Sequence, residues 1–408
     1  MNKKIAQNTF FLYLMTFAKM IVPLLTLPYF TRVLTVDGYA VVSYITSMMA
    51  YVHVILDFGF GLSATKAIVE AGEDKKRISM ILGDTLVAKV ILTGLSFLFC
   101  MVLCAFIPLL RENILYFSLS FVAASLTILL PDFLFRGLEQ MHIITYRFLI
   151  MKGVSTFLCF VVVKGDENLL LIPLLDILGT LVSVGWTWIK IVKMQLWPIF
   201  SSIQNALRAL RISVVYFSSD AATTIFGAFN TMIIGIMLSK EDIAFWSVAT
   251  QLISGVQSLY TPITSGVYPY MVREQDGRLI KRLLCVFMPI VLVGTGIAFL
   301  IGDWLVVLIS GEKYIAASGV LKSLLPLLII SFPSMLLGWP CLGAIRKQRQ
   351  VTLSTVLAAL IQILVLVLLI IWGQLTLFTV AIARIISEIV LLSSRSFFCV
   401  KYKGEFKL

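Results

Sequence analysis

The chain has 408 residues, of which 60% are hydrophobic and 13% are charged, and its formal net charge is +12. A mean hydropathy of +1.00 is far above what the surface of a water-soluble globular protein can hold, so the composition excludes that class. The positive charge would suit a nucleic-acid-binding protein only if the cations gathered on one surface.

Long apolar stretches recur along the whole chain, each near the roughly 20 residues that a membrane-spanning helix needs. The connections between them are too short to hold a folded soluble domain. The sequence therefore predicts an all-α polytopic membrane protein with twelve transmembrane helices. In chain order, these cover residues 8–30, 39–61, 83–107, 114–136, 145–163, 169–191, 211–236, 243–270, 283–301, 319–342, 351–372 and 375–396.

Lys and Arg residues gather on one side of the predicted helices. Most of the 33 lie in the two tails and the even-numbered connections, whereas the odd-numbered connections hold only Arg32, Arg111, Lys164, Lys240 and Lys313. By the positive-inside rule, both termini are expected in the cytoplasm. Since these cations set the topology and are spread over separate segments, nucleic-acid binding is excluded.

An internal repeat divides the chain into halves. Leu34-Thr35-x-Asp37-x-x-Ala40-x-x-Ser43-x-x-Thr46 recurs as Leu238-Ser239-x-Glu241-x-x-Ala244-x-x-Ser247-x-x-Thr250. Both copies start an even-numbered helix in the same orientation, which predicts two parallel six-helix bundles around a central cavity. The alternative is a chance match, because Ala, Ser and Thr are common in packed membrane helices.

The expected domains are residues 1–193 and 211–408, joined by a linker over 194–210. In the linker region, Trp197, Phe200, Ile203, Leu207 and Leu210 recur at helical spacing, with basic residues on the other side. This pattern predicts a helix along the cytoplasmic interface, and a plain tether is the alternative.

Ionisable residues inside the predicted spans are the main functional candidates, because each costs roughly 2.5–3.5 kcal/mol at mid-depth and so faces water or a partner. Lys19, Asp176, Asp220 and Arg384 lie near mid-depth. The alternative for Lys19 is a packing ion pair. Arg384 has Glu388 one turn away, which would neutralise it. Asp176 and Asp220 are either proton carriers or counter-ions to Lys19.

Other ionisable residues and the cysteines are weaker candidates. Lys89 and Lys322 are within two turns of a span end, from which a lysine can snorkel to the interface. His53 and Asp57 share a helix face, as a proton relay or as a hydrogen-bonded structural pair. The six cysteines include no CxxC pair, so we expect free thiols, no metal and no cofactor.

Several motifs together resemble a known family. They are Asn8, the proline-containing run 23–34, Asp37-Gly38-Tyr39, the run 57–66 and Phe135-Arg136-Gly137-Leu138-Glu139. They are similar to polysaccharide-repeat flippases of the Wzx type. This resemblance implies the multidrug/oligosaccharidyl-lipid/polysaccharide exporter superfamily, with two six-helix bundles around a central cleft. It also implies the movement of undecaprenyl-diphosphate-linked oligosaccharide across the bacterial inner (plasma) membrane.

The resemblance and the buried charges predict one mechanism, in which a cationic central cavity attracts the diphosphate. Lys19 is the central cation, Arg384 is a helper, and Lys89 and Lys322 lie nearer the openings. Further candidate substrate residues are Asp176, Asp220, Thr16, Asn230, Gln251 and Gln257, and candidates for proton or ion coupling are Asp57, His53 and Asp220. Membrane lipid and the chain polymerase of the same pathway are candidate partners.

Two other classes stay open at this point. A drug/cation antiporter of the same superfamily would use Asp57, Asp176 and Asp220 as its substrate and coupling site. A membrane enzyme would need a large loop with acid/base groups, and the sequence has neither such a loop nor a nucleotide-binding glycine motif. We therefore expect no enzyme activity.

Overall fold

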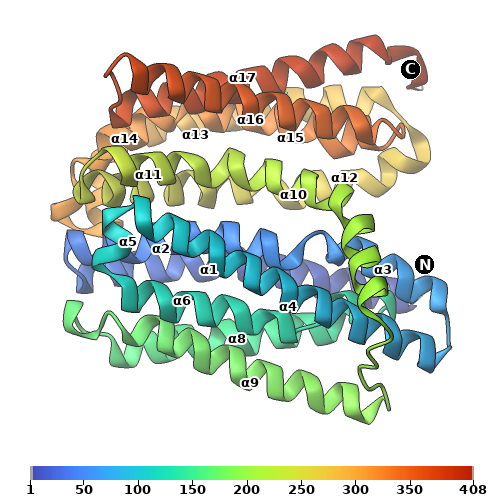
Figure 1. Cartoon of the computed structure of the whole chain (residues 1–408). Coiled ribbons are helices and arrows are strands. Elements are labelled where there is room, and N and C mark those ends of the chain that lie inside the picture. Colours follow the sequence, from blue (N-terminus) through green and yellow to red (C-terminus); the bar gives the residue numbers. More distant parts are fainter. Residues whose placement is uncertain (1–2, 407–408) are drawn as a thin grey trace. The chain divides into compact units, whose positions relative to one another are not determined.

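The computed structural model describes the backbone of residues 3–406; the side chains of 3–6, 215, 218–220, 222, 223, 225, 226 and 269 are not described. Every predicted span lies on a helix (Figure 1). Ten segments of the described chain are long and apolar enough to cross a membrane. The protein is thus an all-α, multi-pass membrane protein, as predicted.

The chain forms two compact units, residues 1–26 with 33–224 and residues 27–32 with 225–408. The helices up to the second unit are α1 (Lys3–Val33), α2 (Val36–Asp57), α3 (Phe60–Ala71), α4 (Lys75–Phe106), α5 (Pro108–Glu112), α6 (Ile114–Leu126), α7 (Asp132–Gly137), α8 (Met141–Val162), α9 (Leu171–Lys193) and α10 (Ile203–Met237). They are followed by α11 (Lys240–Ser258), α12 (Tyr260–Glu274), α13 (Gly277–Ser310), α14 (Ala317–Leu324), α15 (Pro326–Leu336), the π-helix η4 (Leu337–Gly343), α16 (Gln348–Ile371) and α17 (Leu377–Lys401). The domain limits expected from the sequence stay a prediction.

Several predicted spans are broken or longer than expected. The second span is α2 and α3, the fourth is α6 and α7, the eighth is α11 and α12, and the tenth is α14, α15 and η4. The third span, α4, begins earlier than predicted, and the ninth span, α13, extends beyond its prediction at both ends. Both helices begin early because the aspartates Asp74 and Asp276 cap their first turns. On α13, Ile290, Val293 and Leu300 are strongly exposed, as expected for side chains that face lipid.

Both copies of the repeat begin a helix with a side-chain cap. The Thr35 hydroxyl accepts a hydrogen bond from the Gly38 N–H at the start of α2, and the Ser239 hydroxyl accepts one from the Asp242 N–H at the start of α11. Thr35 also donates from its backbone N–H to Asp166 Oδ1 at 2.9 Å and from its hydroxyl to Asp166 Oδ2. The repeated Thr/Ser position is therefore a helix start in each copy.

The linker differs from its prediction. Residues between Lys193 and Ile203 are not helical, so the expected helical pattern begins only with α10. The Ile199 N–H donates to the Ser79 carbonyl at 2.9 Å, and Ser201 donates to both carboxylate oxygens of the buried Asp84. These bonds hold the segment against α4. The backbone N–H groups of residues 199 and 201 are satisfied by acceptors on α4, and therefore do not need the hydrogen bonds of a helix.

A sharp kink lies in the second unit. Gly338 of η4 has non-helical angles (φ −70°, ψ −115°), and the Arg395 guanidinium of α17 donates from Nη1 to the Ser334 carbonyl at 2.7 Å. Pro333 and Pro340 flank the kink, and proline removes backbone donors from a helix. Arg395 thus satisfies a carbonyl next to the interruption.

Candidate functional site

The break between α2 and α3 places Asp57 at the end of a helix. Phe58 and Gly59 both have left-handed backbone angles, with φ of 44° and 75°. A Cβ on Gly59 would lie 2.6 Å from Tyr216 Cβ and 2.8 Å from the Phe217 nitrogen, so only glycine fits there. The Phe58 and Phe217 rings stack beside the break, with centroids 4.5 Å apart.

A second break precedes α7. The chain leaves its helix at Leu130 and Pro131, and α7 begins at Asp132. Proline cannot continue the helical hydrogen bonds, which explains the interruption. Asp132 and Arg136 are four residues apart and therefore share a face of the new helix.

These breaks bring together a group that we name the N-terminal charge cluster: Lys19, Asp57, Lys89, Asp132, Arg136 and Arg147. Two ion pairs form within it. Lys89 Nζ lies 3.7 Å from Asp57 Oδ1, and Arg147 Nη2 lies 2.6 Å from Asp132 Oδ2. The charged groups that act on Lys19 are Asp132, Arg136, Arg147 and Asp57.

Positive charge is in excess in the cluster, since four cations surround two carboxylates. Lys89 and Arg147 are buried, with 6% and 7% of their surface exposed. In the described structure, Nε of Arg136 and Nε of Arg147 are buried without a hydrogen-bond partner. Guanidinium groups with unused donors are suited to an anion that presents several oxygens.

Lys19 itself is exposed on α1, and its ammonium lies 5.5 Å from the centre of the Phe148 ring. Among the described residues, no carboxylate forms an ion pair with it. The contact with the ring face attracts the ammonium without neutralising its charge. Lys19 is therefore available to a ligand on this side of α1.

Lys89 is buried, and not exposed at a helix end from which a lysine could snorkel to the interface. Because α4 already begins at Lys75, Lys89 lies several turns inside the helix, buried and paired with Asp57. Asp57 therefore has Lys89 as its ion-pair partner. His53, one turn before Asp57, is close to the charges of Lys152, Asp176 and Asp57.

Asp176 is not a counter-ion to Lys19. Its carboxylate accepts hydrogen bonds from Lys152 Nζ at 3.0 Å and from the Ser155 hydroxyl at 2.6 Å. The neighbouring helix α8 supplies both donors, because α8 and α9 pack along each other. The side chain of Asp220 lies outside the described residues.

The second unit holds a buried polar group that we name the C-terminal network: Asn230, Gln362, Arg384, Ser387 and Glu388. Arg384 Nη1 donates to Glu388 Oε2 at 2.8 Å, which is the pairing that their spacing predicts. Gln362 donates to Asn230 Oδ1 at 3.1 Å and accepts from the Ser387 hydroxyl at 3.0 Å. One cation thus faces one carboxylate in this network.

The remaining candidates belong neither to the N-terminal charge cluster nor to the C-terminal network. Lys322 Nζ forms an ion pair with Asp303 at 2.7 Å, and the Thr16 hydroxyl donates to the Leu12 carbonyl of its own helix. Gln251 and Gln257 are half-buried on α11. Arg32, from one of the family-like motifs, donates to the Leu308 carbonyl at 2.6 Å and so anchors the end of α13.

Three members of the N-terminal charge cluster, Asp132, Arg136 and Arg147, are not among the site candidates that the sequence predicts. Arg136 appears there only within a family-like motif, and Arg147 is buried on α8. Asp132 follows Pro131 directly, so the proline inside a predicted span was the signal that could have found it. A broken helix at membrane depth exposes polar groups only where they face protein or water.

The fold and the charge cluster define a polytopic, all-α membrane protein with broken helices. Among solved structures, the chain is similar to an inward-facing multidrug resistance MATE family transporter of the MOP superfamily, with a TM-score of 0.67 and 14% identity over 94% of this chain and 99% of that one. It is also similar to the lipid II flippase MurJ in an inward closed conformation, with a TM-score of 0.71 and 14% identity over 95% of this chain and 86% of that one. At such identities, the likeness shows the fold alone.

The sequence matches the polysaccharide biosynthesis protein family over residues 5–275, which is more than half of the chain. The chain therefore belongs to this family. A Shigella dysenteriae protein named "Putative O-antigen transporter" is 26% identical over 369 residues, 88% of this chain and 91% of that protein. An Escherichia coli (strain K12) protein of the same name is 23% identical over 266 residues, 64% of each chain. The family expected from the sequence motifs is confirmed.

Proposed function

We propose that this protein is a flippase that moves undecaprenyl-diphosphate-linked oligosaccharide across the bacterial inner membrane by alternating access, with both termini in the cytoplasm. Family membership supports this proposal, as do the two relatives named as O-antigen transporters. The chain polymerase that consumes the flipped unit is the expected partner.

The observation that carries the proposal is the excess positive charge of the N-terminal charge cluster. A diphosphate loses its hydration when it enters a membrane protein, and cations that the protein holds in place offset that cost. Lys89 and Arg147 are buried and held by carboxylates, while Lys19 and Arg136 supply charge beyond what the carboxylates neutralise. We assign diphosphate binding to Lys19, Lys89, Arg136 and Arg147.

The remaining candidates have supporting roles in this mechanism. Polar groups such as Thr16, Asn230, Gln251 and Gln257 would contact sugar hydroxyls. Asp57 is the candidate coupling group, since protonating it would leave Lys89 without its counter-charge and strengthen anion binding. His53, one turn away on α2, is the second candidate for proton or ion coupling. Arg384 is held by Glu388, so we assign it to the C-terminal network.

Export of the cognate surface glycan in cells that lack the native gene tests the proposal. Lys19→Ala should lower export at least about tenfold, because losing one charge-assisted contact costs roughly 1.5–3 kcal/mol. Lys19→Asp should abolish it. The matched control is Lys164→Asp, a charge reversal at an exposed loop residue, which should leave export and protein level unchanged. Normal export in both Lys19 variants at normal protein levels would refute the electrostatic mechanism.

The second candidate function is a drug/cation antiporter. A cationic drug would approach Asp57 and Asp132 against four surrounding positive charges, which disfavours its binding. Resistance to cationic drugs should therefore not change when the protein is expressed. A clear rise in resistance that depends on Asp57 would favour the antiporter.

A further inference from the structure

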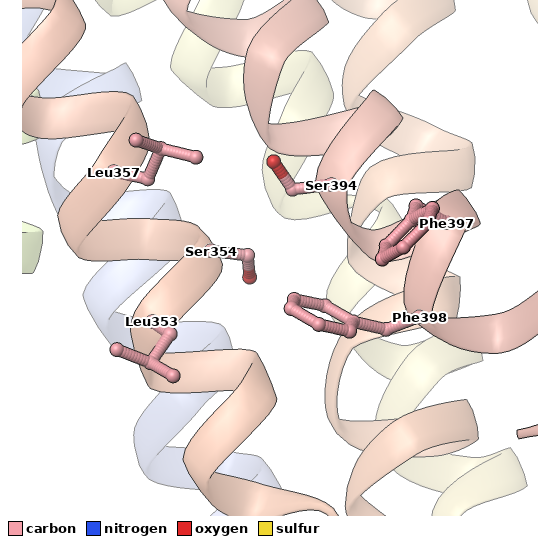
Figure 2. Close-up of a pocket in the computed structure, with 6 residues that line it drawn as sticks. All are labelled: Leu353, Ser354, Leu357, Ser394, Phe397 and Phe398. Carbon is pink, nitrogen blue, oxygen red and sulfur yellow. The ribbon is translucent and has the colours of Figure 1, made fainter. Parts of the chain in front are cut away.

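A groove runs between α16 and α17 in the second unit. Its volume is about 440 Å³, within the roughly 300–1,000 Å³ typical of small-molecule pockets. Leu353, Ser354 and Leu357 line it from α16, and Ser394, Phe397 and Phe398 line it from α17. Figure 2 shows Ser354 and Phe398 directed toward each other across the gap.

The walls of the groove offer apolar surface. Leu353 and Leu357 are about half exposed and Phe397 is more exposed still, so the groove opens on the outer side of these helices, where lipid is expected. The Ser354 hydroxyl is already engaged, because it donates to the Val351 carbonyl at 2.7 Å and accepts from Arg395 Nε at 3.3 Å. A hydrocarbon chain suits such a surface better than a polar ligand.

One end of the groove carries two cations. Arg349 lies one turn before Leu353 on the same face of α16, and Lys401 lies one turn after Phe397 on the same face of α17. Because a short connection makes α16 and α17 antiparallel, both cations lie at the same end, which is the predicted cytoplasmic one. Both are exposed, and the nearby acid Glu405 pairs with Lys347 at 2.8 Å rather than with either of them.

We propose that this groove binds an anionic phospholipid of the cytoplasmic leaflet. An acyl chain lies along Leu353, Leu357 and Phe397, and the phosphate contacts Arg349 and Lys401. Basic residues at a membrane surface attract anionic headgroups, and an apolar groove directly below them fixes the chain. This site is separate from the proposed substrate site and does not depend on the transported molecule.

Native mass spectrometry of the delipidated full-length protein, titrated with phosphatidylglycerol or phosphatidylcholine, tests the proposal. Phosphatidylglycerol should bind about 25-fold more tightly, at about fivefold for each cation. Arg349→Gln combined with Lys401→Gln should remove that preference. Leu357→Trp, which fills the groove, should weaken the binding of both lipids.

Matched variants control for surface charge and for bulk. Arg111→Gln with Lys164→Gln removes two exposed cations from the other predicted side, and Leu360→Trp adds the same ring to an exposed position outside the groove. Neither should change lipid binding. The proposal fails if both lipids bind equally, or if Leu357→Trp behaves like Leu360→Trp. Tighter binding of undecaprenyl phosphate than of phosphatidylglycerol at this groove would also overturn it, in favour of the substrate's own chain as occupant.

Discussion

The N-terminal charge cluster and the C-terminal network hold their charges in different ways. In the N-terminal charge cluster, four cations surround two carboxylates, and buried Nε atoms of Arg136 and Arg147 have no partner in the described structure. In the C-terminal network, Arg384 faces Glu388, and Gln362 bonds to both Asn230 and Ser387. Paired charges and satisfied amides fix helices in place, whereas excess charge of one sign remains available to a ligand.

This difference predicts that one double variant recovers glycan export and that its counterpart in the first unit does not. Arg384→Gln alone leaves the buried Glu388 carboxylate without its cation, which should cost about 3–5 kcal/mol of stability. Adding Glu388→Gln should restore both thermal stability in detergent and glycan export. In the first unit, Asp57→Asn leaves the buried Lys89 unpaired and should be similarly destabilising.

Adding Lys89→Gln to Asp57→Asn should restore stability without restoring export, because the cluster has then lost a cation that the diphosphate needs. Thermal unfolding and export, each corrected for protein level, measure the two effects separately. If this double variant exports normally, the N-terminal charge cluster only stabilises the fold, as the C-terminal network does. The proposed difference between the cluster and the network is then wrong.

A smaller effect is expected at the kink of the second unit. A Cβ on Gly338 would lie 2.9 Å from Arg395 Nη1, so Gly338→Ala should push the guanidinium off the Ser334 carbonyl. Overpacking of this kind costs about 1–3 kcal/mol, seen as a lower unfolding temperature. Gly319→Ala is the control, because a Cβ there meets nothing within 4 Å. Equal stability of the two variants would show that Arg395 does not hold the kink.

The sequence predicted most of the fold, because the length and hydrophobicity of an apolar stretch are local signals. It also predicted the pair of Arg384 and Glu388, whose spacing of four residues places them on one helix face. It could not predict that Lys89 meets Asp57 or that Arg147 meets Asp132, because these partners lie on different helices and their contact depends on where α2 and α6 break. The burial of Lys89 well inside α4 could not be predicted for a related reason, since the start of α4 depends on a cap at Asp74.

The smallest expected effect separates the two copies of the repeat. Thr35→Ala and Ser239→Ala each remove a helix N-cap, which costs about 0.5–2 kcal/mol. The Thr35 hydroxyl also donates a hydrogen bond to Asp166, and the Ser239 hydroxyl donates one to Asp242 Oδ2 at 2.7 Å, so either substitution leaves a carboxylate with one donor fewer. Asp242 lies in the first turn of the same helix, whereas Asp166 belongs to a different segment, so Thr35→Ala also removes a tertiary contact and should lower the unfolding temperature more than Ser239→Ala does.

Conservative variants refine this last comparison. Thr35→Ser keeps both hydroxyl contacts and should be close to wild type, and Asp166→Asn should lower stability in the wild-type background more than in the Thr35→Ala background. That non-additivity is expected for two groups in direct contact. If Thr35→Ala and Ser239→Ala lower the unfolding temperature equally, the contact with Asp166 contributes little to stability. The helix cap alone then determines how much each of the two residues stabilises the protein.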